Sequence, residues 1–297
     1  MASVLDRTKQ ALEGFQRQEI DINGITTVVY SAGIGEPMVY LHGSGTFTGF
    51  GFARQWIKTH RVILPYHPGF GESADDSRIE SIQDYVLHYL DLFDALGLEQ
   101  INLVGSSLGG WIASEIAIMQ PRRIARLVLV SPGGLIAKDL PSTDLFSVPP
   151  KDLAGYLVAD PAVLTPFMPE GHDLEFMTLR YRETTSSARL TWERPGNAKL
   201  GLWLHRITSS TLLLWGEGDR VKPLAQANVW LSLLPNARLE VMKGVGHLPL
   251  DEQDAAADIV LTFLKAEPGA AKAAASITGK ASKSLASRRY SPSSRGS

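Results

Sequence analysis

A serine flanked by glycines is the group of residues in this chain that most clearly points to chemistry. It lies in Gly105-Ser-Ser-Leu-Gly109, a G-x-S-x-G motif that directly follows the apolar run Ile101–Val104. Apolar side chains then repeat at helical spacing from Trp111 to Met119, so the motif joins a predicted strand to a predicted helix. Such a tight turn exposes the hydroxyl at the edge of a sheet, beside the partly positive helix N-terminus. We predict that Ser107 is a nucleophile; a purely structural turn is the alternative.

A serine hydroxyl becomes a useful nucleophile only when a base removes its proton. Of the seven histidines, His247 is the predicted base, because its Gly-rich loop follows the apolar run Leu239–Met242 and so reaches the same sheet edge. We expect the others to be structural or solvent-facing: His42 as a brace, His88 on an exposed helix face, His60 and His205 at exposed boundaries, and His172 in a loop. The pattern predicts no role for His67.

A third residue must hold the histidine and stabilise its protonated form. The apolar run Leu212–Trp215 ends in a Gly-rich turn that carries Asp219, at the same predicted edge as the serine and the histidine. The resulting order Ser…Asp…His is typical of one class of serine hydrolases and differs from the orders in chymotrypsin and subtilisin. Glu217 and Asp251 are the competing acids.

Acyl transfer also requires backbone N–H groups that stabilise the tetrahedral oxyanion. One predicted donor is Leu108, which directly follows the nucleophile. The second is Ser44, in the loop His42-Gly-Ser-Gly45 that follows the third predicted strand. The glycines there allow the backbone to approach a ligand closely.

These loops are positioned by alternating strands and helices. Short apolar runs predict strands at Ile25–Ser31, Met38–Leu41, Arg61–Pro65, Ile101–Val104, Leu127–Val130, Leu212–Trp215 and Leu239–Met242. Helical spacing recurs between several of them, and the nearly pure apolar runs are typical of strands buried on both faces. The pattern predicts an α/β fold with an open, mainly parallel sheet.

One long segment interrupts this alternation. Residues 133–206 contain no clear strand and seven prolines, and the segment is too long for a loop in a compact domain. We therefore predict an inserted helical cap, flanked by a core made of residues 1–132 and 207–267. Apolar cap residues could line a substrate pocket or simply pack the cap: Phe146, Leu157, Phe167, Met168, Phe176, Met177 and Trp192.

Composition narrows the possible functions. The 297 residues include 29 basic and 31 acidic residues and no cysteine, which excludes disulfides, cysteine-containing metal sites and thiol nucleophiles. No apolar run is long enough to span a bilayer. Residues 268–297 hold six basic and no acidic residues among mostly small ones, so we expect a disordered basic tail. We expect a cytoplasmic protein without nucleic-acid or membrane partners; its oligomeric state is left open.

Taken together, the motifs resemble those of the α/β-hydrolase superfamily over residues 20–264. The matching segments are Leu41-His-Gly-Ser-Gly45, Pro68-Gly-Phe-Gly-Glu-Ser73, Gly105-Ser-Ser-Leu-Gly-Gly110, Leu214-Trp-Gly-Glu-Gly-Asp219 and Gly246-His247. The resemblance implies an eight-stranded sheet with the cap inserted after the sixth strand. A serine at position 107, rather than an aspartate, argues against the epoxide hydrolase and haloalkane dehalogenase branches.

Within the superfamily, the elbow resembles those of capped esterases and of the meta-cleavage-product (C–C) hydrolases. The C–C hydrolases usually place a tryptophan after the catalytic histidine, where this chain has Leu248. A second departure is Tyr66-His67, where many relatives carry an acid.

The sequence therefore leads to three hypotheses. The first is a serine hydrolase that cleaves a small or medium carboxylic ester through an acyl-enzyme, with no metal or organic cofactor. The second uses the same residues to cleave a carbon–carbon bond in a vinylogous diketone. The third is a ligand receptor of hydrolase fold without turnover.

Overall fold

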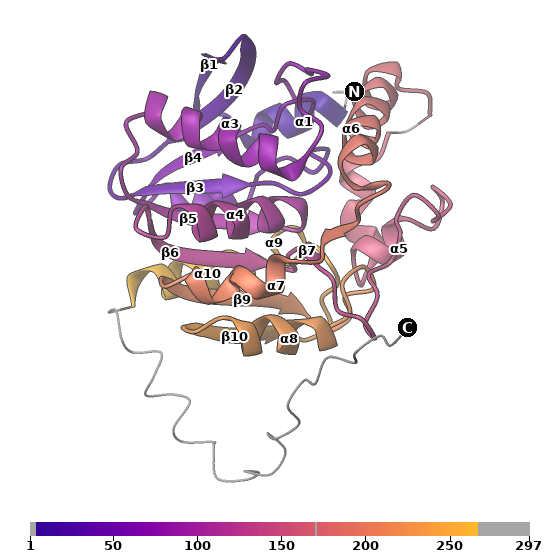
Figure 1. The fold of residues 1–297 in the computed structure, drawn as a ribbon. Helices are drawn as coiled ribbons and strands as arrows, with labels where there is room; N and C mark the ends of the chain where they lie inside the picture. Colours follow the sequence, from indigo (N-terminus) through magenta and orange to yellow (C-terminus); the bar gives the residue numbers. More distant parts are fainter. Residues whose placement is uncertain (1–3, 170, 267–297) are drawn as a thin grey trace, which may run out of the picture. The chain divides into compact units, whose positions relative to one another are not determined.

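A central sheet organises the molecule. The computed structural model describes residues 4–169 and 171–266, which form one compact unit (Figure 1). Eight strands form the sheet in the order β1-β2-β4-β3-β5-β6-β9-β10. This is the predicted α/β-hydrolase architecture, a mainly parallel sheet flanked by helices. The expected basic tail, residues 268–297, lies outside the described residues.

The strand boundaries extend most of the predicted runs by a few residues. They are β1 (Gln16–Ile22), β2 (Ile25–Ala32), β3 (Pro37–Leu41), β4 (Arg61–Pro65), β5 (Ile101–Ser106), β6 (Ile124–Val130), β9 (Ser210–Gly216) and β10 (Ala237–Met242). β1 and β2 are antiparallel, β2 pairs antiparallel with β4, and every other pairing in the sheet is parallel. The carboxyl ends of β3, β5, β6, β9 and β10 therefore meet at one edge.

β1 was missed from the sequence because it is mostly polar. Its residues alternate in burial at an edge of the sheet, and only Ile22 is fully buried. Asn23 and Gly24 join it to β2 with φ angles of 54° and 84°. Two such left-handed residues form the tight turn that suits a right-twisted hairpin.

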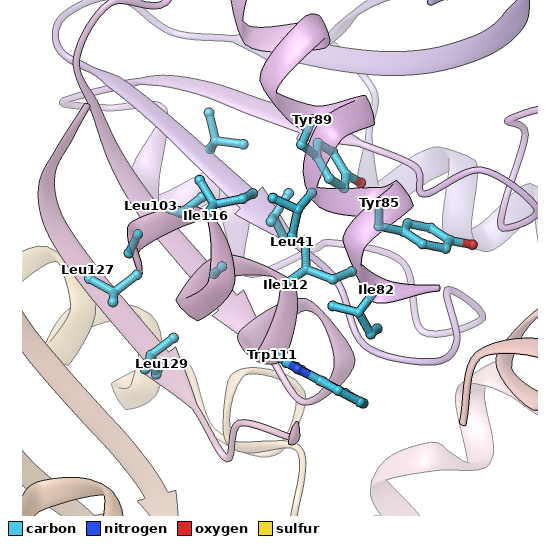
Figure 2. Close-up of a cluster of buried hydrophobic side chains, with 14 of the residues drawn as sticks. Leu41, Ile82, Tyr85, Tyr89, Leu103, Trp111, Ile112, Ile116, Leu127 and Leu129 are labelled. Atoms are coloured by element: carbon cyan, nitrogen blue, oxygen red, sulfur yellow. The ribbon is translucent and has the colours of Figure 1, made fainter. Parts of the chain in front are cut away.

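Helices cover both faces of the sheet. One face carries α3 (Ile82–Ala95), α4 (Leu108–Met119) and α8 (Ala225–Leu233), and the other carries α2 (Ala53–Trp56), α9 (Pro249–Glu252) and α10 (Asp254–Lys265). Successive strand residues point to opposite faces, so Leu41 packs on the first layer and Tyr40 on the second. Figure 2 shows the first layer, with α3 and α4 packed on the strands.

The chain after His247 forms two helices in succession, α9 and α10. Gln253 lies between α9 and α10 in an extended conformation, with φ −145° and ψ 127°. The short α9 thus continues the loop that carries His247 before the long helix α10 begins. Residues 225–233, for which no helix was expected, form α8.

In its described part, the segment between β6 and β9 contains several short helices and one long one, and we call this segment the cap. The helices are α5 (Ala154–Leu157), the 3-10 helix η1 (Pro161–Phe167), α6 (Leu174–Thr191), α7 (Leu200–Trp203) and the 3-10 helix η2 (Leu204–Arg206). Two strands of two residues each, β7 (Gly134–Leu135) and β8 (Gly196–Asn197), pair where the segment leaves and rejoins the core. No helix in residues 4–169 and 171–266 is long and apolar enough to cross a bilayer.

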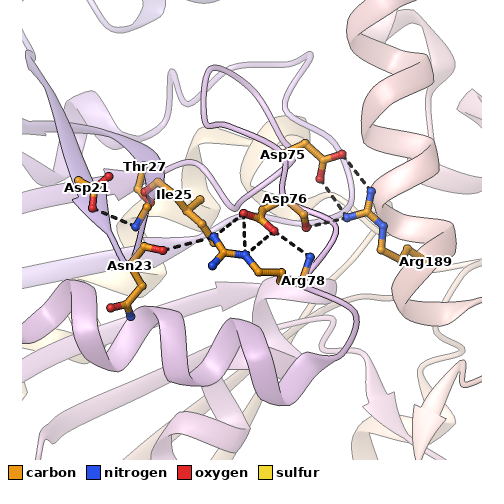
Figure 3. Close-up of polar contacts among 9 residues, drawn as sticks. Asp21, Asn23, Ile25, Thr27, Asp75, Asp76, Arg78 and Arg189 are labelled. Carbon is orange, nitrogen blue, oxygen red and sulfur yellow. Dashed lines mark hydrogen bonds and ion pairs between the residues drawn. The ribbon is translucent and has the colours of Figure 1, made fainter.

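An ion pair connects helix α6 to the core. Arg189 contacts both carboxylate oxygens of Asp75, at 2.9 and 3.0 Å, and also donates to the carbonyl of Asp76 (Figure 3). On the same core loop, Asp76 pairs with Arg78, which donates to the Asn23 carbonyl of the β1–β2 hairpin. This chain of contacts links the cap helix to the edge of the sheet.

Candidate active site

Ser107 occupies the tight turn between β5 and α4. Its backbone has φ 50° and ψ −111°, a left-handed conformation that a non-glycine residue adopts at a cost of about 1–3 kcal/mol. A Cβ at Gly109 would lie 2.0 Å from the Leu41 carbonyl oxygen, and one at Gly105 would lie 2.4 Å from that of Gly109. The glycines of the motif are therefore required by close backbone packing beneath the serine.

The structure brings the three predicted catalytic side chains into one hydrogen-bonded line. His247 Nε2 lies 3.0 Å from Ser107 Oγ, and His247 Nδ1 lies 2.9 Å from Asp219 Oδ2. Because the carboxylate only accepts, Nδ1 carries the proton and donates, which leaves Nε2 to accept from the serine hydroxyl. This is the protonation state in which the imidazole can act as a base toward Ser107.

Asp219 is held by the backbone that follows β9. Its Oδ1 accepts hydrogen bonds from the N–H groups of Val221 (2.9 Å) and Lys222 (2.7 Å), which leaves Oδ2 for His247. Burial acts to raise the pKa of Asp219, but His247 and the Lys222 N–H outweigh it, so the pKa lies below its ordinary value. Asp219 is therefore a buried, ionised partner for the imidazole.

The two competing acids lie elsewhere. Glu217 is exposed. Asp251 bonds the Thr48 side chain, and burial raises its pKa to about 7. Neither has a hydrogen bond to His247 among the described residues, whereas Asp219 has one.

The loop of His247 is held by two residues that sequence reasoning missed. Glu252 on α9 accepts from the N–H of Gly246 (2.7 Å) and from that of Ala159 in the cap (2.8 Å). The carbonyl of Leu157, at the end of α5, accepts from the N–H groups of His247 (2.9 Å) and Leu248 (3.1 Å). The cap thus fixes the backbone of the histidine directly. No motif marks Glu252, because its partners are backbone groups and one of them, the Ala159 N–H, is 93 residues away.

The predicted oxyanion loop lies beside the nucleophile. A Cβ at Gly43 would be 3.4 Å from Ser107 Cβ, so the backbone of residues 42–45 passes within contact distance of the serine. Within the described part of the chain, the N–H groups of Ser44 and Leu108 donate to no protein acceptor. Both are free to bind a ligand oxygen, and their role as oxyanion donors stays a prediction.

A cation from the cap also reaches this loop. A Cβ at Gly45 would lie 2.5 Å from Arg180 Nη1, and the Arg180 guanidinium stacks 4.8 Å from the centre of the Phe47 ring. Glu183, one turn further along α6, pairs with Arg180 at 2.7 Å and accepts from the Thr46 hydroxyl and N–H at 2.5 and 3.3 Å. No sequence pattern marks this pair, because its position depends on how α6 packs on the core.

The apolar residues expected in the cap fall into two groups. Phe176 forms a buried cluster with Phe47, Val158 and Leu164, against which Leu157, Phe167 and Leu248 pack. Met168, Met177 and Trp192 are instead exposed by 45%, 54% and 67%, and Phe146 packs on Trp192 with ring centres 5.4 Å apart. The first group therefore packs the cap beside Leu248, the residue after His247, whereas Met168, Met177 and Trp192 lie at the surface.

Two expectations about the remaining histidines were wrong. His88 is buried, with Nε2 2.9 Å from the Thr27 hydroxyl, and His60 is also buried, with Nδ1 2.9 Å from the Thr59 hydroxyl. His172 and His205 are exposed, as expected. No group of three or more His, Asp or Glu side chains in residues 4–169 and 171–266 is arranged to hold a metal ion.

The amino-acid sequence also matches known proteins. Residues 38–259 match the sequence model of the family described as "Alpha/beta hydrolase family". The 2-hydroxy-6-oxo-2,4-heptadienoate hydrolase of Pseudomonas putida is 28% identical over 276 residues, which cover 82% of this chain and 94% of that protein.

Two solved structures share the fold. A bacterial membrane phospholipase A has a TM-score of 0.72 and 22% identity over 88% of this chain and 90% of its own. The 2-hydroxy-6-oxo-6-phenylhexa-2,4-dienoate hydrolase of Rhodococcus sp. has a TM-score of 0.68 and 20% identity over 85% and 99%.

Proposed function

Because this chain belongs to the alpha/beta hydrolase family, we propose that it is a serine hydrolase that cleaves a carbon–carbon bond in a 2-hydroxy-6-oxo-dienoate. The observation that carries the hydrolase proposal is the hydrogen-bonded line Ser107–His247–Asp219. The substrate class rests on the 28% identity to a hydrolase of that name over 276 residues. The sequence alone placed ester hydrolysis before C–C cleavage, and this proposal places C–C cleavage first.

The proposed reaction begins from the keto form of the substrate, in which the proton of the 2-hydroxyl group has moved to C5. Ser107 Oγ attacks the C6 carbonyl, His247 Nε2 takes the serine proton, and Asp219 stabilises the imidazolium. The negative oxygen that forms on C6 is bound by the N–H groups of Ser44 and Leu108.

Collapse of this intermediate breaks the C5–C6 bond. The electron pair moves from C5 through the C3–C4 double bond to the C2 carbonyl oxygen, so the leaving group is a conjugated dienolate rather than a free carbanion. The proton that His247 took from the serine passes to the C2 oxygen of the dienolate, which leaves as a 2-hydroxy-2,4-dienoate, and C6 remains as an acyl group on Ser107. Water, deprotonated by His247, then hydrolyses this acyl-enzyme.

Arg180 supports an anionic substrate. A dienoate carries a carboxylate, and burying it requires a paired cation. The guanidinium of Arg180 lies against Gly45 and stacks on the ring of Phe47. Gly45 belongs to the loop of residues 42–45, which passes beside Ser107 at Gly43. We assign the substrate carboxylate to this side chain.

Ester hydrolysis is the second candidate, and Leu248 favours it. The C–C hydrolases that this chain resembles usually carry a tryptophan after the catalytic histidine, whereas Leu248 packs here against the cap cluster of Phe47, Val158, Leu164 and Phe176. An ester needs no electron sink, because an alkoxide or phenolate leaves directly.

A paired assay separates the candidates. Purified protein is given 2-hydroxy-6-oxo-2,4-heptadienoate, whose visible absorbance is lost on cleavage, and in parallel p-nitrophenyl butyrate. We expect cleavage of the dienoate with the higher kcat/KM, and loss of both activities in Ser107→Ala. Hydrolysis of the ester with an unchanged dienoate would establish the second candidate. A parent protein that acts on neither compound and is not labelled by a fluorophosphonate would support the receptor hypothesis.

The role of Arg180 has its own control. Arg180→Gln should raise KM for the dienoate by about tenfold to 100-fold, the equivalent of one charged hydrogen bond, and should leave KM for the neutral ester unchanged. Arg182→Gln is the matched variant, because this neighbouring arginine of α6 donates to the Gly71 carbonyl instead. Equal effects of both variants on both substrates would contradict the assignment.

A further inference from the structure

His67 has no assigned role, yet it is one of the most completely bonded side chains in the molecule. It follows β4, is fully buried, and lies with its ring centre 3.7 Å from that of His42. Its Nδ1 meets the hydroxyl of Tyr89 on α3, and its Nε2 lies 2.8 Å from the carbonyl oxygen of His42. Its backbone N–H lies 2.9 Å from His42 Nε2.

The direction of each of these hydrogen bonds follows from the backbone partners. A carbonyl oxygen only accepts, so His67 Nε2 carries the proton and donates to the His42 carbonyl. Its Nδ1 is then unprotonated in the neutral ring, so the Tyr89 hydroxyl donates to it. A backbone N–H only donates, so His42 Nε2 accepts from His67.

The same reasoning extends this series of hydrogen bonds into the predicted oxyanion loop, residues 42–45. Since His42 Nε2 accepts, its Nδ1 carries the proton and donates to the carbonyl oxygen of Gly43 at 2.7 Å. Burial lowers the pKa of His42 to about 3 and that of His67 well below its ordinary value, so both rings are neutral and keep these tautomers.

The Gly43 carbonyl belongs to the same peptide unit as the Ser44 N–H. In a planar trans peptide the C=O and N–H bonds point in opposite directions. A carbonyl fixed toward the His42 ring therefore directs the Ser44 N–H away from that ring. The Gly43 backbone passes beside Ser107, with 3.4 Å between a Cβ at Gly43 and Ser107 Cβ.

We propose that His67, held in one tautomer by Tyr89, is a positioning residue that sets the orientation of the Ser44 N–H through His42. The series of hydrogen bonds runs from the Tyr89 hydroxyl through the His67 ring to the His42 backbone and ring, and from there to the Gly43–Ser44 peptide. This proposal rests on the proposed serine catalysis at Ser107. It applies to ester and C–C cleavage alike, because both reactions pass through an oxyanion.

The alternative to this role is ordinary packing, and α3 offers a matched control. Tyr85 lies one turn before Tyr89, is equally buried, and has its ring centre 5.7 Å from that of His67 (Figure 2). Its hydroxyl donates at 2.6 Å to the Pro68 carbonyl, outside the series of hydrogen bonds that reaches Gly43. Tyr85→Phe and Tyr89→Phe thus each remove one buried hydroxyl from the same helix face.

The test compares kcat and KM of these two variants for p-nitrophenyl butyrate, or for the dienoate if the parent prefers it. Tyr89→Phe should lower kcat by about tenfold, the equivalent of one neutral hydrogen bond, with KM unchanged, whereas Tyr85→Phe should leave both constants near those of the parent. His67→Gln keeps an N–H near the Nε2 position and should retain more kcat than His67→Leu.

A second readout reports on the oxyanion itself. A trifluoromethyl ketone adds reversibly to the serine as a charged hemiketal, whereas the matching methyl ketone binds without forming one. Tyr89→Phe should weaken binding of the trifluoromethyl ketone by about the same factor as kcat and leave binding of the methyl ketone unchanged. A purely structural role would weaken both or neither.

The outcomes separate failure of this inference from failure of the proposed function. A parent that cleaves neither the dienoate nor the ester and is not labelled by a fluorophosphonate overturns the proposed function. A labelled, active parent whose Tyr85→Phe and Tyr89→Phe variants show the same kcat overturns the role of His67 while leaving the hydrolase in place. Circular dichroism of each variant shows whether it is folded, and Tyr89→Phe, which deletes a single oxygen atom, decides the question if His67→Leu does not fold.

Discussion

Replacement of Asp219 by asparagine should nearly abolish turnover through a change of tautomer rather than a change of shape. Oδ1 of Asp219 accepts from two backbone N–H groups, those of Val221 and Lys222. An asparagine must keep its carbonyl oxygen toward these donors, which turns its NH₂ group toward His247 Nδ1. That nitrogen must then accept, so the ring proton moves to Nε2, which faces Ser107 Oγ at 3.0 Å. A protonated Nε2 cannot take the proton of the serine.

The size of the effect follows from the same geometry. In serine proteases the equivalent change of tautomer costs about 10⁴ in kcat. At about 1.36 kcal/mol per decade, this is about 5.4 kcal/mol of transition-state stabilisation. Asparagine retains the carbonyl that caps Val221 and Lys222, so we expect Asp219→Asn to remain folded and to bind substrate as the parent does.

The assay is steady-state hydrolysis of p-nitrophenyl butyrate, with circular dichroism for each variant. Glu217→Gln and Asp251→Asn are the controls and should stay within about tenfold of the parent, a change of less than about 1.4 kcal/mol, because neither acid bonds His247. Near-parental turnover of Asp219→Asn together with collapse of either control would refute the assignment of the acid. Ser107 and His247 would then need a different partner.

Three further predictions concern single side chains. Ser107→Ala should lose fluorophosphonate labelling and turnover while keeping the parent's circular dichroism spectrum; residual labelling would point to another nucleophile. Glu252→Ala removes the acceptor of the Gly246 and Ala159 N–H groups, and we expect kcat to fall by about tenfold or more in steady-state assays. An unchanged kcat would show that the loop of His247 keeps its conformation without Glu252. Asp251 has a pKa raised to about 7, so the folded state binds its proton more tightly than the unfolded state does, and this group should make the protein less stable as pH rises from about 4 to about 7. Urea unfolding at about pH 5 and about pH 8 should show a smaller difference in Asp251→Asn than in the parent; an equal difference would assign the pH dependence to other groups.

The fold and the juxtaposition of Ser107, Asp219 and His247 could be predicted from sequence because each signal is local. A strand that is buried on both faces appears as an apolar run, and the turn at its carboxyl end shows its glycines beside the reactive residue. Parallel strands end at one edge, so Ser107, Asp219 and His247 could be placed together without knowledge of any distance. β1 was missed for the same reason, since an edge strand with a solvated face carries mostly polar residues.

Tertiary structure alone decided which groups support these three. Glu252 joins the histidine loop to Ala159, 93 residues away, and Glu183 joins Arg180 to Thr46, 137 residues away from Glu183, so both sets of contacts depend on how the cap packs on the core. The tautomers of His42 and His67 follow from bonds to backbone atoms and to Tyr89 that exist only after β4 and α3 have packed. Local sequence encodes strands and turns through short-range sterics and hydrophobic periodicity, whereas a hydrogen bond between distant segments depends on their relative placement, which the packing of the whole core determines.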